Sequence, residues 1–288
     1  MLHALAIWLH GGIKTREARF LNAAFQFLYF YNLYNRGANM QSEPNQTPKI
    51  PLSKPVPSNY IGVWQRHLLE TNVIKDDTSL VLWMQSQHYH IDVRIPATCT
   101  GFKAASALQD YSDEELLLLA SQQGFTGLTH ITPSTATSSE ICQWVREIDY
   151  QAPTDARDIG KMVFTDANTV IETGIDDAYL EIWRRLENSH EPCYFTFTTG
   201  KNNRGRDVPT YFMRAGNHVA IARPRTVSVP KAPTLIHAVQ SHKPTREQLL
   251  DWLDMEISFG EMLDENHWQI KHSTLPFKQN LIIELPNN

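Results

Sequence analysis

Short segments of alternating polar and apolar residues fill the sequence from Tyr60 onward, and they constrain the fold more than any other feature. Segments of this kind, rich in Val, Ile, Thr and aromatic residues and bounded by turn-forming residues, predict β-strands. They lie at residues 61–69, 79–85, 88–95, 127–132, 141–150, 159–164, 169–173, 179–186, 193–198, 210–214, 217–223, 255–259, 268–274 and 281–285. Many short strands with few helices indicate an all-β barrel or sandwich rather than an α/β sheet.

Two stretches predict helices, residues 112–120 and 245–253. Ser112 stands three residues before Glu115, and Thr245 stands three residues before Gln248. This spacing is typical of a capping box, in which each side chain bonds to the backbone N–H of the other. We therefore expect a short capped helix at the same place in each half of the chain.

The helices belong to a longer pattern that occurs twice. Ser112 and Thr245 are 133 residues apart, and so are Gly127 and Gly260. Further segments match in the same order: 64–66 with 183–185, 91–94 with 220–223, 144–146 with 268–270, and 170–172 with 282–284. Shared order favours an internal duplication. We predict two pseudo-repeated barrels, at residues 60–176 and 177–288, each with one short helix.

The head of the first expected strand carries a family resemblance. Gly62-Val63-Trp64, with Arg66 two residues on, resembles the G-x-W opening of lipocalins and other calycins. The resemblance implies a β-barrel whose closed end is crossed by the tryptophan, with an arginine packed over it. The body of the chain also resembles an uncharacterised bacterial family of tandem lipocalin-like domains, for which the resemblance implies a fold and no activity.

The second half departs from this motif. Trp183 and Arg185 occupy the places that correspond to Trp64 and Arg66, but Glu181 stands where the glycine would be. We expect all four Trp and Arg residues to have a structural role at the barrel ends, where a guanidinium can stack on an indole.

Composition excludes several classes of function. The chain has 26 Lys and Arg against 31 Asp and Glu, for a net charge of −5, and it contains no basic stripe of the kind that nucleic-acid binders carry. Its three cysteines, Cys99, Cys142 and Cys193, form no C-x-x-C pair. An odd number of unpaired cysteines argues against a disulfide framework and a thiolate zinc site, and we expect a cytoplasmic protein.

Residues 1–39 differ in composition from the rest of the chain. They place Lys14, Arg16 and Arg19 before an apolar run at 20–31, which is the outline of a secretory signal. However, Asn22 and Gln26 interrupt the run, which is too short to span a membrane. Three interpretations stay open: an upstream extension with the natural start at Met40, a peripheral amphipathic helix, or a signal or anchor. We expect residues 1–59 to be poorly ordered, because residues 41–59 are polar and rich in proline.

Candidate chemistry lies on the expected strand 88–95. Residues two apart share a face of a strand, so His90, Asp92 and Arg94 lie together. One interpretation places this charged face in water. The repeat favours the other, because it aligns Val219 and Ile221 with His90 and Asp92, so that both faces of the second copy are apolar. We therefore hypothesise that the three side chains point into the first barrel.

A small, largely apolar molecule is the ligand that we expect, because a barrel of about eight strands can enclose one. His90, Asp92 and Arg94 would line the pocket together with Arg146 and Gln85. Two alternatives stay open. One is an enzyme in which His90 is the acid or base, Asp92 orients it, and Arg94 or Arg146 holds an anionic oxygen. The other is an interaction module with filled barrels.

Other chemistry has weaker support. His88-x-His90 suits a divalent ion, but no obvious third ligand lies nearby, so we predict no metal site. Acid–base work could use Asp149, Asp158, Glu172 or Glu181; Glu172 matches Glu284 in the repeat, which favours a structural role for it. The sequence contains no P-loop, G-x-S-x-G elbow, H-E-x-x-H helix or dinucleotide fingerprint, and we expect no cofactor.

Overall fold

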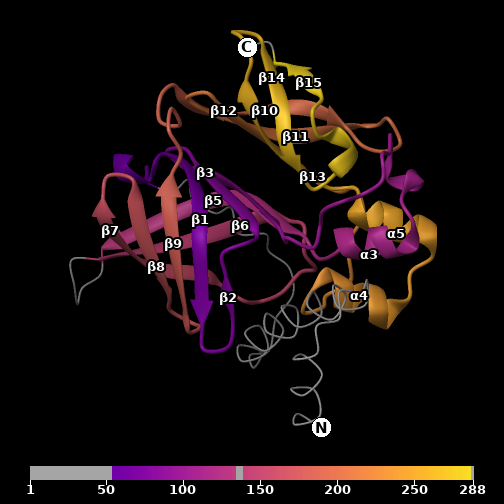
Figure 1. The fold of residues 1–288 in the computed structure, drawn as a ribbon, viewed down its shortest axis with the longest axis horizontal. Coiled ribbons are helices and arrows are strands. Elements are labelled where there is room, and N and C mark those ends of the chain that lie inside the picture. The colour runs from indigo at the N-terminus through magenta and orange to yellow at the C-terminus, as the bar shows by residue number, and fades with distance from the viewer. Residues whose placement is uncertain (1–53, 134–138, 287–288) are drawn as a thin grey trace.

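A closed antiparallel barrel forms the first part of the chain (Figure 1). The computed structural model describes residues 54–133 and 139–286. The barrel strands are β1 (Gly62–Thr71), β3 (Leu80–Gln85), β4 (Tyr89–Ile95), β5 (Gln123–Pro133), β6 (Glu140–Asp149), β7 (Asp158–Asp166), β8 (Thr169–Gly174) and β9 (Tyr179–Arg185). Each strand pairs with the next, and β9 pairs back onto β1, which closes the barrel. A short β2 (Lys75–Asp76) extends β1.

The second part is an open six-stranded sheet, which does not close into a barrel and which we call the half-barrel. Its strands are β10 (Cys193–Lys201), β11 (Asp207–Ala215), β12 (His218–Arg223), β13 (Glu256–Met262), β14 (His267–Ser273) and β15 (Ile282–Glu284). They pair in sequence order, and β10 and β15 remain as the two edges. The chain is therefore all-β, as predicted, with a closed first barrel and a half-barrel after it.

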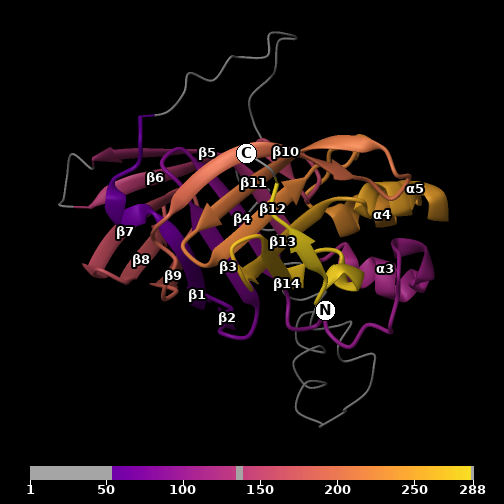
Figure 2. The same ribbon diagram turned by 90° about the horizontal axis from the view of Figure 1, so that it is seen from above.

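Three short helices lie together beside the sheets (Figures 1 and 2). They are α3 (Asp113–Leu119), α4 (Leu235–His242) and α5 (Arg246–Leu253). Both predicted capping boxes form: Ser112 and Glu115 bond reciprocally at the start of α3, and Thr245 and Gln248 do so at α5. Helix α4 was not predicted, so the second half carries two helices instead of one.

The predicted boundary at residue 176 does not match the strand pairing. Strand β9 was assigned to the second half, yet it lies between β8 and β1 and completes the first barrel. Trp64 and Trp183 are consequently not equivalent positions in two barrels. They stand on adjacent strands of one barrel, where Trp64 pairs with Arg185 and Arg66 pairs with Trp183.

The strands around the helices do follow the repeat. His90 pairs with Gly127 across β4 and β5, and Val219 pairs with Gly260 across β12 and β13. A β-bulge begins at each of these glycines. The unit of strand, helix and two strands is thus present twice, with the registers that the sequence alignment implied.

The half-barrel packs on the outer wall of the closed barrel. One large apolar core runs between the two and includes Ile91 and Val93 of β4, Ala220 and Ala222 of β12, and Ile257 of β13. Residues 91 and 93 alternate with 90 and 92 along β4. Since the odd-numbered pair faces the half-barrel, the even-numbered pair must face the lumen of the barrel.

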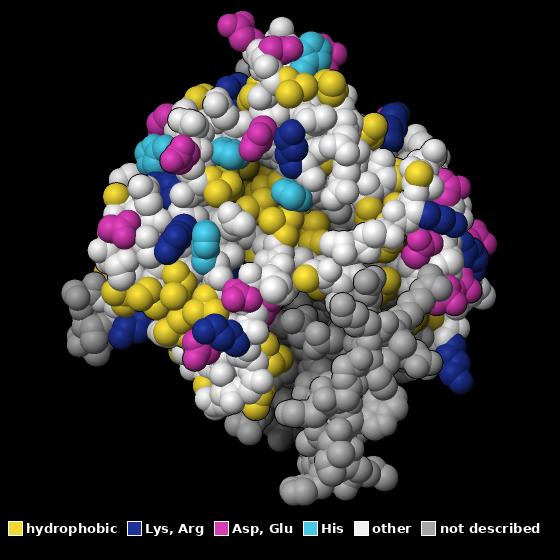
Figure 3. All heavy atoms as spheres, in the orientation of Figure 1, with side chains coloured by type: hydrophobic (Ala, Val, Ile, Leu, Met, Phe, Trp, Pro, Cys, Tyr) yellow, Lys and Arg dark blue, Asp and Glu magenta, His cyan; other side chains and the backbone are white. Residues whose placement is uncertain are grey.

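A hydrophobic hollow marks part of this junction on the surface (Figure 3). The crevice measures about 120 Å³ and is lined by Val63, Leu82 and Phe259, with His218 and His272 among its other residues. The second sheet therefore covers the outer face of β1 and β3 incompletely.

The predicted N-terminal extension lies mostly outside the described residues, since its positions 1–53 are not described. Residues 54–59 are described, and part of this segment packs on the barrel. Val56 is buried and donates its backbone N–H to the carbonyl of Gln87, and Ser58–Tyr60 form a 3-10 turn. No described helix is long and apolar enough to cross a membrane.

Candidate functional site

Four tryptophans fill one end of the first barrel. Trp64, Trp83 and Trp183 are almost completely buried, and Trp144 is 7% exposed. Trp83 is at the centre: its ring centroid lies 6.1 Å from that of Trp64, 5.5 Å from Trp144 and 5.8 Å from Trp183. These rings project from strands on opposite walls, so they occupy the lumen. The apolar part of the barrel is filled by the protein's own side chains.

The arginine that stacks over Trp64 differs from the one that the family resemblance implied. The guanidinium carbon of Arg185 on β9 lies 4.6 Å from the centroid of the Trp64 ring, whereas Arg66 takes part in ion pairs deeper in the barrel. Residues 64 and 66 face the same way along β1, which places Arg66 one layer further from the closed end. Arg185 stands directly opposite Trp64 across the pairing of β1 with β9.

His90 and Gln85 lie in one buried chain of hydrogen bonds. Gln85 Oε1 accepts from the Trp83 indole N–H at 3.1 Å and from the Thr129 hydroxyl at 2.8 Å. The Thr129 hydroxyl hydrogen is thereby used, so its oxygen must accept from His90 Nδ1, 3.0 Å away. His90 is consequently the Nδ1–H tautomer. Its Nε2 is buried without a hydrogen-bond partner among the described residues.

Burial keeps His90 neutral. It lowers the pKa of the imidazole to about 3, an effect that the nearby Arg146 and Arg94 reinforce and Asp158 opposes. The enzymatic interpretation required Asp92 to orient His90, but His90 bonds to Thr129 and Asp92 bonds to Arg94. The acid–base pair expected from the sequence is therefore not formed.

Asp92 and Arg94 form a buried ion pair on β4. Arg94 Nε donates to Asp92 Oδ1 at 2.9 Å, and the Asp92 side chain is 3% exposed. Burial raises the pKa of Asp92, although Arg94 opposes the shift. His90, Asp92 and Arg94, the three residues predicted to share a face of this strand, thus lie inside the barrel rather than in water. Their role in binding stays a prediction.

Arg146 on β6 bridges two carboxylates. Its guanidinium donates to Asp149 at 2.7 Å and to Asp158 at 2.6 Å, and it lies 3.7 Å over the ring of Phe125. Burial alone would raise the pKa of Asp158, but Arg146 and Arg94 outweigh it and lower the pKa. Arg146 therefore packs over the Phe125 ring inside the barrel and neutralises the charge of Asp158, the first residue of β7.

Arg66 joins a second set of buried charges. It donates to Asp76 at 2.7 Å and to Glu181 at 2.8 Å, and all three side chains are at most 6% exposed. Hydrogen bonds from residues 78 and 79, together with Arg66, outweigh burial and lower the pKa of Asp76. Since buried charges are costly unless paired, this triad explains why β2 folds back onto β1.

Glu172 differs from the other carboxyl groups of the lumen. It lies directly opposite Glu181 across β8 and β9 and is 3% exposed. Its two oxygens accept from neutral donors, the Tyr179 hydroxyl at 2.6 Å and the Trp183 indole at 3.0 Å, and it has no ion pair among the described residues. Burial raises the pKa of Glu172 well above its ordinary value, and Glu181 adds to the shift.

A cavity of about 100 Å³ opens above these groups at the end of the barrel away from the tryptophans. Its lining includes two of the predicted residues, Arg94 and Arg146. The remaining lining residues are Leu69, Gln123, Ala156, Arg157, Asp158, Ile159, Glu172, Asp176, Asp177, Tyr179 and Glu181. We call this space the mouth cavity. His90, Asp92 and Gln85 lie beneath it, in the barrel.

A larger groove of about 530 Å³ adjoins the mouth cavity. It runs between β6, the segment at 149–158 and residues 224–229 that come after β12. The groove and the cavity share Arg146, Ala156, Arg157 and Asp158. A molecule longer than the cavity could therefore continue along the outer wall of the barrel.

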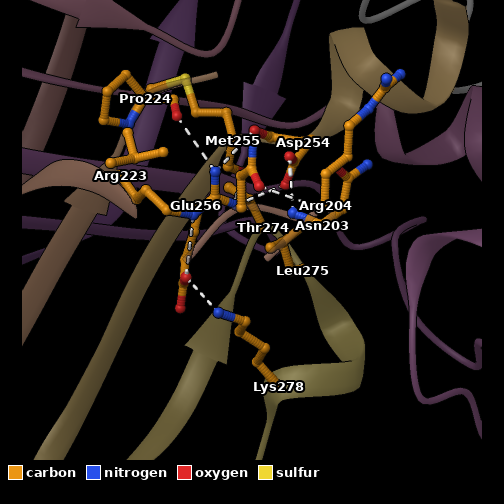
Figure 4. A network of polar contacts seen from close by, with 12 residues as sticks. Asn203, Arg204, Arg223, Pro224, Asp254, Met255, Glu256, Thr274, Leu275 and Lys278 are labelled. Carbon is orange, nitrogen blue, oxygen red and sulfur yellow. Dashed lines mark hydrogen bonds and ion pairs between the residues drawn. The ribbon is translucent and has the colours of Figure 1, made fainter. Parts of the chain in front are cut away.

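The half-barrel carries a different polar centre (Figure 4). Arg223 on β12 donates to Asp254 at 2.6 Å, and its Nε lies 3.7 Å from Glu256. Lys278 contacts the same Glu256 carboxylate at 2.5 Å. Asn203 donates its backbone N–H to Asp254 at 3.0 Å. Every charge of this centre has an opposite partner, so the network stabilises the start of β13.

Sequence reasoning identified part of the mouth cavity and missed the rest. Asp158, Glu172 and Glu181 were considered only as carboxylates on or beside strands, and Tyr179 was not considered. Glu172, Tyr179 and Glu181 lie on the neighbouring strands β8 and β9, and their positions became informative only once both strands were known to close one barrel, whereas Asp158 begins β7. No group of three metal-binding side chains is found in the described parts of the chain.

Comparisons with known proteins give no family. No family model matches the chain, and no curated protein matches it. A crystal structure of an uncharacterised protein from Saccharomyces cerevisiae is similar at a TM-score of 0.43 and 10% sequence identity, over 74% of this chain and 84% of that one. The closed barrel with a half-barrel fits a calycin-like fold on its own topology.

Proposed function

We propose that the first barrel binds a small positively charged group in its mouth cavity. The expected apolar ligand would need the lumen that the four tryptophans fill. The space above them is polar: its lining carries three arginines against five carboxyl residues. Ligand pockets use a few fixed polar groups to orient their ligand, and here the excess is acidic.

The arginines of the cavity are poor partners for an anion. Arg94 is held by Asp92, Arg146 by Asp149 and Asp158, and Arg157 by Asp176. An anionic ligand would have to displace a carboxylate from each guanidinium that it reached. A cation would meet the same competition at Asp158, Asp176 and Glu181, which arginines hold, but it meets none at Glu172, which forms no ion pair in the described residues.

Glu172 is the observation that carries the proposal. It lines the cavity, it is buried, and it forms no ion pair in the described residues, although the nearby Arg94 partly opposes the rise of its pKa. Burial without an ion pair favours the protonated form of such a carboxyl group over an isolated charge. A bound ammonium or guanidinium group would take the place of that proton, and the hydrogen bonds from Tyr179 and Trp183 would orient the carboxylate.

Cavity size limits the ligand. A cavity of about 150 Å³ accommodates benzene, so the 100 Å³ of the mouth cavity fits a head group of a few heavy atoms. A longer molecule would place its head at Glu172 and its remainder in the adjoining groove.

Isothermal titration calorimetry with methylguanidinium, methylammonium and acetate tests the proposal. We expect the two cations to bind and to release a proton, so that their affinity rises with pH, by up to about tenfold per pH unit, while Glu172 is protonated in the free protein. Glu172→Gln should abolish both effects. Glu284→Gln, at the exposed end of β15, is the matched control and should change neither. Binding of acetate in preference to both cations would refute the proposal.

A further inference from the structure

The two edges of the half-barrel differ in how they are protected. Strand β15 is three residues long, and Pro286 stands two residues after its end. Strand β10 is nine residues long and contains neither a proline nor a charged residue before Lys201 at its end. Natural proteins usually protect exposed edges with charges, prolines, bulges or short strands. The β10 edge has none of these over its first eight residues.

The hydrogen bonds at the ends of β10 show which of its backbone groups face outward. Gly216 donates to the carbonyl of Pro192 at 2.8 Å, and Asn202 donates to the carbonyl of Arg206 at 3.0 Å. Bonded and non-bonded pairs alternate along an antiparallel ladder. Even-numbered residues therefore bond to β11, and the odd-numbered residues from 193 to 201 direct their N–H and C=O groups away from the sheet.

Most of these outward groups are accessible, and the strand is held in place. Two of them have local partners that a second strand would replace: the Cys193 N–H donates to Glu191 Oε2 at 3.2 Å, and the Phe197 carbonyl accepts from the Thr196 hydroxyl at 3.5 Å. Across residues 54–133 and 139–286, β10 pairs with no strand other than β11. The Phe197 side chain is 56% exposed. Phe195 stacks on Tyr89 of the barrel with 3.9 Å between ring centroids, and this contact anchors the strand. The edge is thus an ordered template for another strand.

We propose that β10 pairs with β10 of a second copy of this chain, antiparallel and with the two-fold axis at Thr196. This register places Phe195 opposite Phe197 and Cys193 opposite Thr199. Each pair joins two odd-numbered residues, and such pairs exchange two hydrogen bonds in an antiparallel ladder. At the two-fold axis, Thr196 lies opposite Thr196 of the second copy, and these two residues exchange no backbone hydrogen bonds.

Charge complementarity favours this partner and this register. Glu191 and Lys201 stand five residues before and five residues after Thr196. Glu191 lies in the bend just before β10, and Lys201 ends the strand, where it also pairs with Asp207 of its own chain. On pairing, the exposed glutamate of each copy therefore comes near the exposed lysine of the other, at both ends of the interface. In a two-fold interface of this kind the β10 edge of each copy is paired with the other, so the assembly closes as a dimer. The two six-stranded sheets become one continuous sheet.

Sedimentation velocity of the full chain over a range of concentrations is the first test. We expect a monomer–dimer equilibrium that Thr199→Pro shifts to monomer, because this variant removes an outward N–H and leaves the bonds to β11 intact. Ile282→Lys, on the opposite edge, is the control and should leave the dimer unchanged. A chain that is monomeric up to about 100 μM would overturn the proposal.

Cross-linking tests the register without depending on the proline variant. Residues opposite each other in a non-bonded antiparallel pair are close enough for a disulfide. Thr196→Cys should give an oxidised covalent dimer, and Thr198→Cys, with the same three native cysteines, should not. Lys201→Glu should weaken the dimer roughly tenfold at low salt, and Glu191→Lys combined with it should restore affinity. Equal cross-linking at 196 and 198, or no rescue by the charge exchange, would rule out this interface.

Discussion

The first barrel and the half-barrel share the same strand pairing around a bulge glycine, but the side chains on the inner face of these strands differ. Register equates Gly127 with Gly260, and from there His90 with Val219 and Asp92 with Ile221. The same alignment across the next strand pair equates Arg146 with Ile270, because each lies opposite its bulge glycine. Three polar positions of the closed barrel are therefore hydrocarbon in the open sheet.

This difference indicates that charged side chains can be buried at these positions only where the barrel is closed. Val219 and Ile270 pack with Trp268 and Phe212 in a small apolar cluster of the half-barrel. A closed barrel encloses its interior on all sides, so buried charges can find partners on several strands, as Arg146 and Arg66 do. The one buried arginine that the open sheet keeps on the matching strand, Arg223, takes its partners from the segment before β13 and from the start of that strand.

The largest expected effect comes from breaking the buried ion pair of Asp92 and Arg94 in the first barrel. Asp92→Ala leaves Arg94 without its buried partner and should destabilise the protein by about 3–5 kcal/mol in urea unfolding. Replacing both residues, as Asp92→Ile with Arg94→Met, should recover most of that loss, because a well-packed hydrocarbon pair often substitutes for a buried ion pair. A double variant as unstable as the single one would contradict this account of the lumen.

The bulge glycines give the next largest effect and test the duplication. A Cβ on Gly127 would lie 2.0 Å from the carbonyl oxygen of Val145, and a Cβ on Gly260 would lie 2.0 Å from that of Gln269. Backbone must move in either case, so Gly127→Ala and Gly260→Ala should each cost about 3 kcal/mol. Costs measured by urea unfolding that differ by more than about 2 kcal/mol would argue against equivalent bulges.

His90 should give the closed barrel a pH dependence that the half-barrel lacks at Val219. The folded pKa of about 3 lies below the ordinary value of 6.5, so the unfolded chain binds a proton first as the pH falls. Stability should decrease from about pH 6.5 towards pH 3, by up to about 1.4 kcal/mol per pH unit. His90→Asn can keep the donor to Thr129 and should reduce that slope; an unchanged slope would show that other groups cause it.

The helix caps should give the smallest effect, and an equal one in both halves. Ser112→Ala and Thr245→Ala each remove an acceptor for a backbone N–H in the first turn. Each should cost about 1 kcal/mol in urea unfolding. A cost at one cap only would show that the two helices contribute differently despite their matching sequences.

Local patterns predicted most of the strands and both capped helices. Alternation along 88–95, together with its apolar counterpart at 217–223, also predicted that His90 and Asp92 face inward. Closure was not predictable in the same way, because the pairing of β9 with β1 depends on the whole ring of strands. For this reason Trp183 and Arg185 were placed in the wrong half, and Tyr179 was not connected with Glu172. Helix α4 lacks a reciprocal capping box, and it was missed.

Carbon-13 NMR of the Glu172 carboxyl group, titrated with and without methylguanidinium, tests the central claim most directly. In the free protein we expect this carboxyl to titrate well above the ordinary pKa of 4.5, because it is buried beside Glu181. Bound methylguanidinium should lower that pKa, since the cation favours the carboxylate. A Glu172 resonance that titrates normally in the free protein, or that is unaffected by saturating methylguanidinium, would contradict the account.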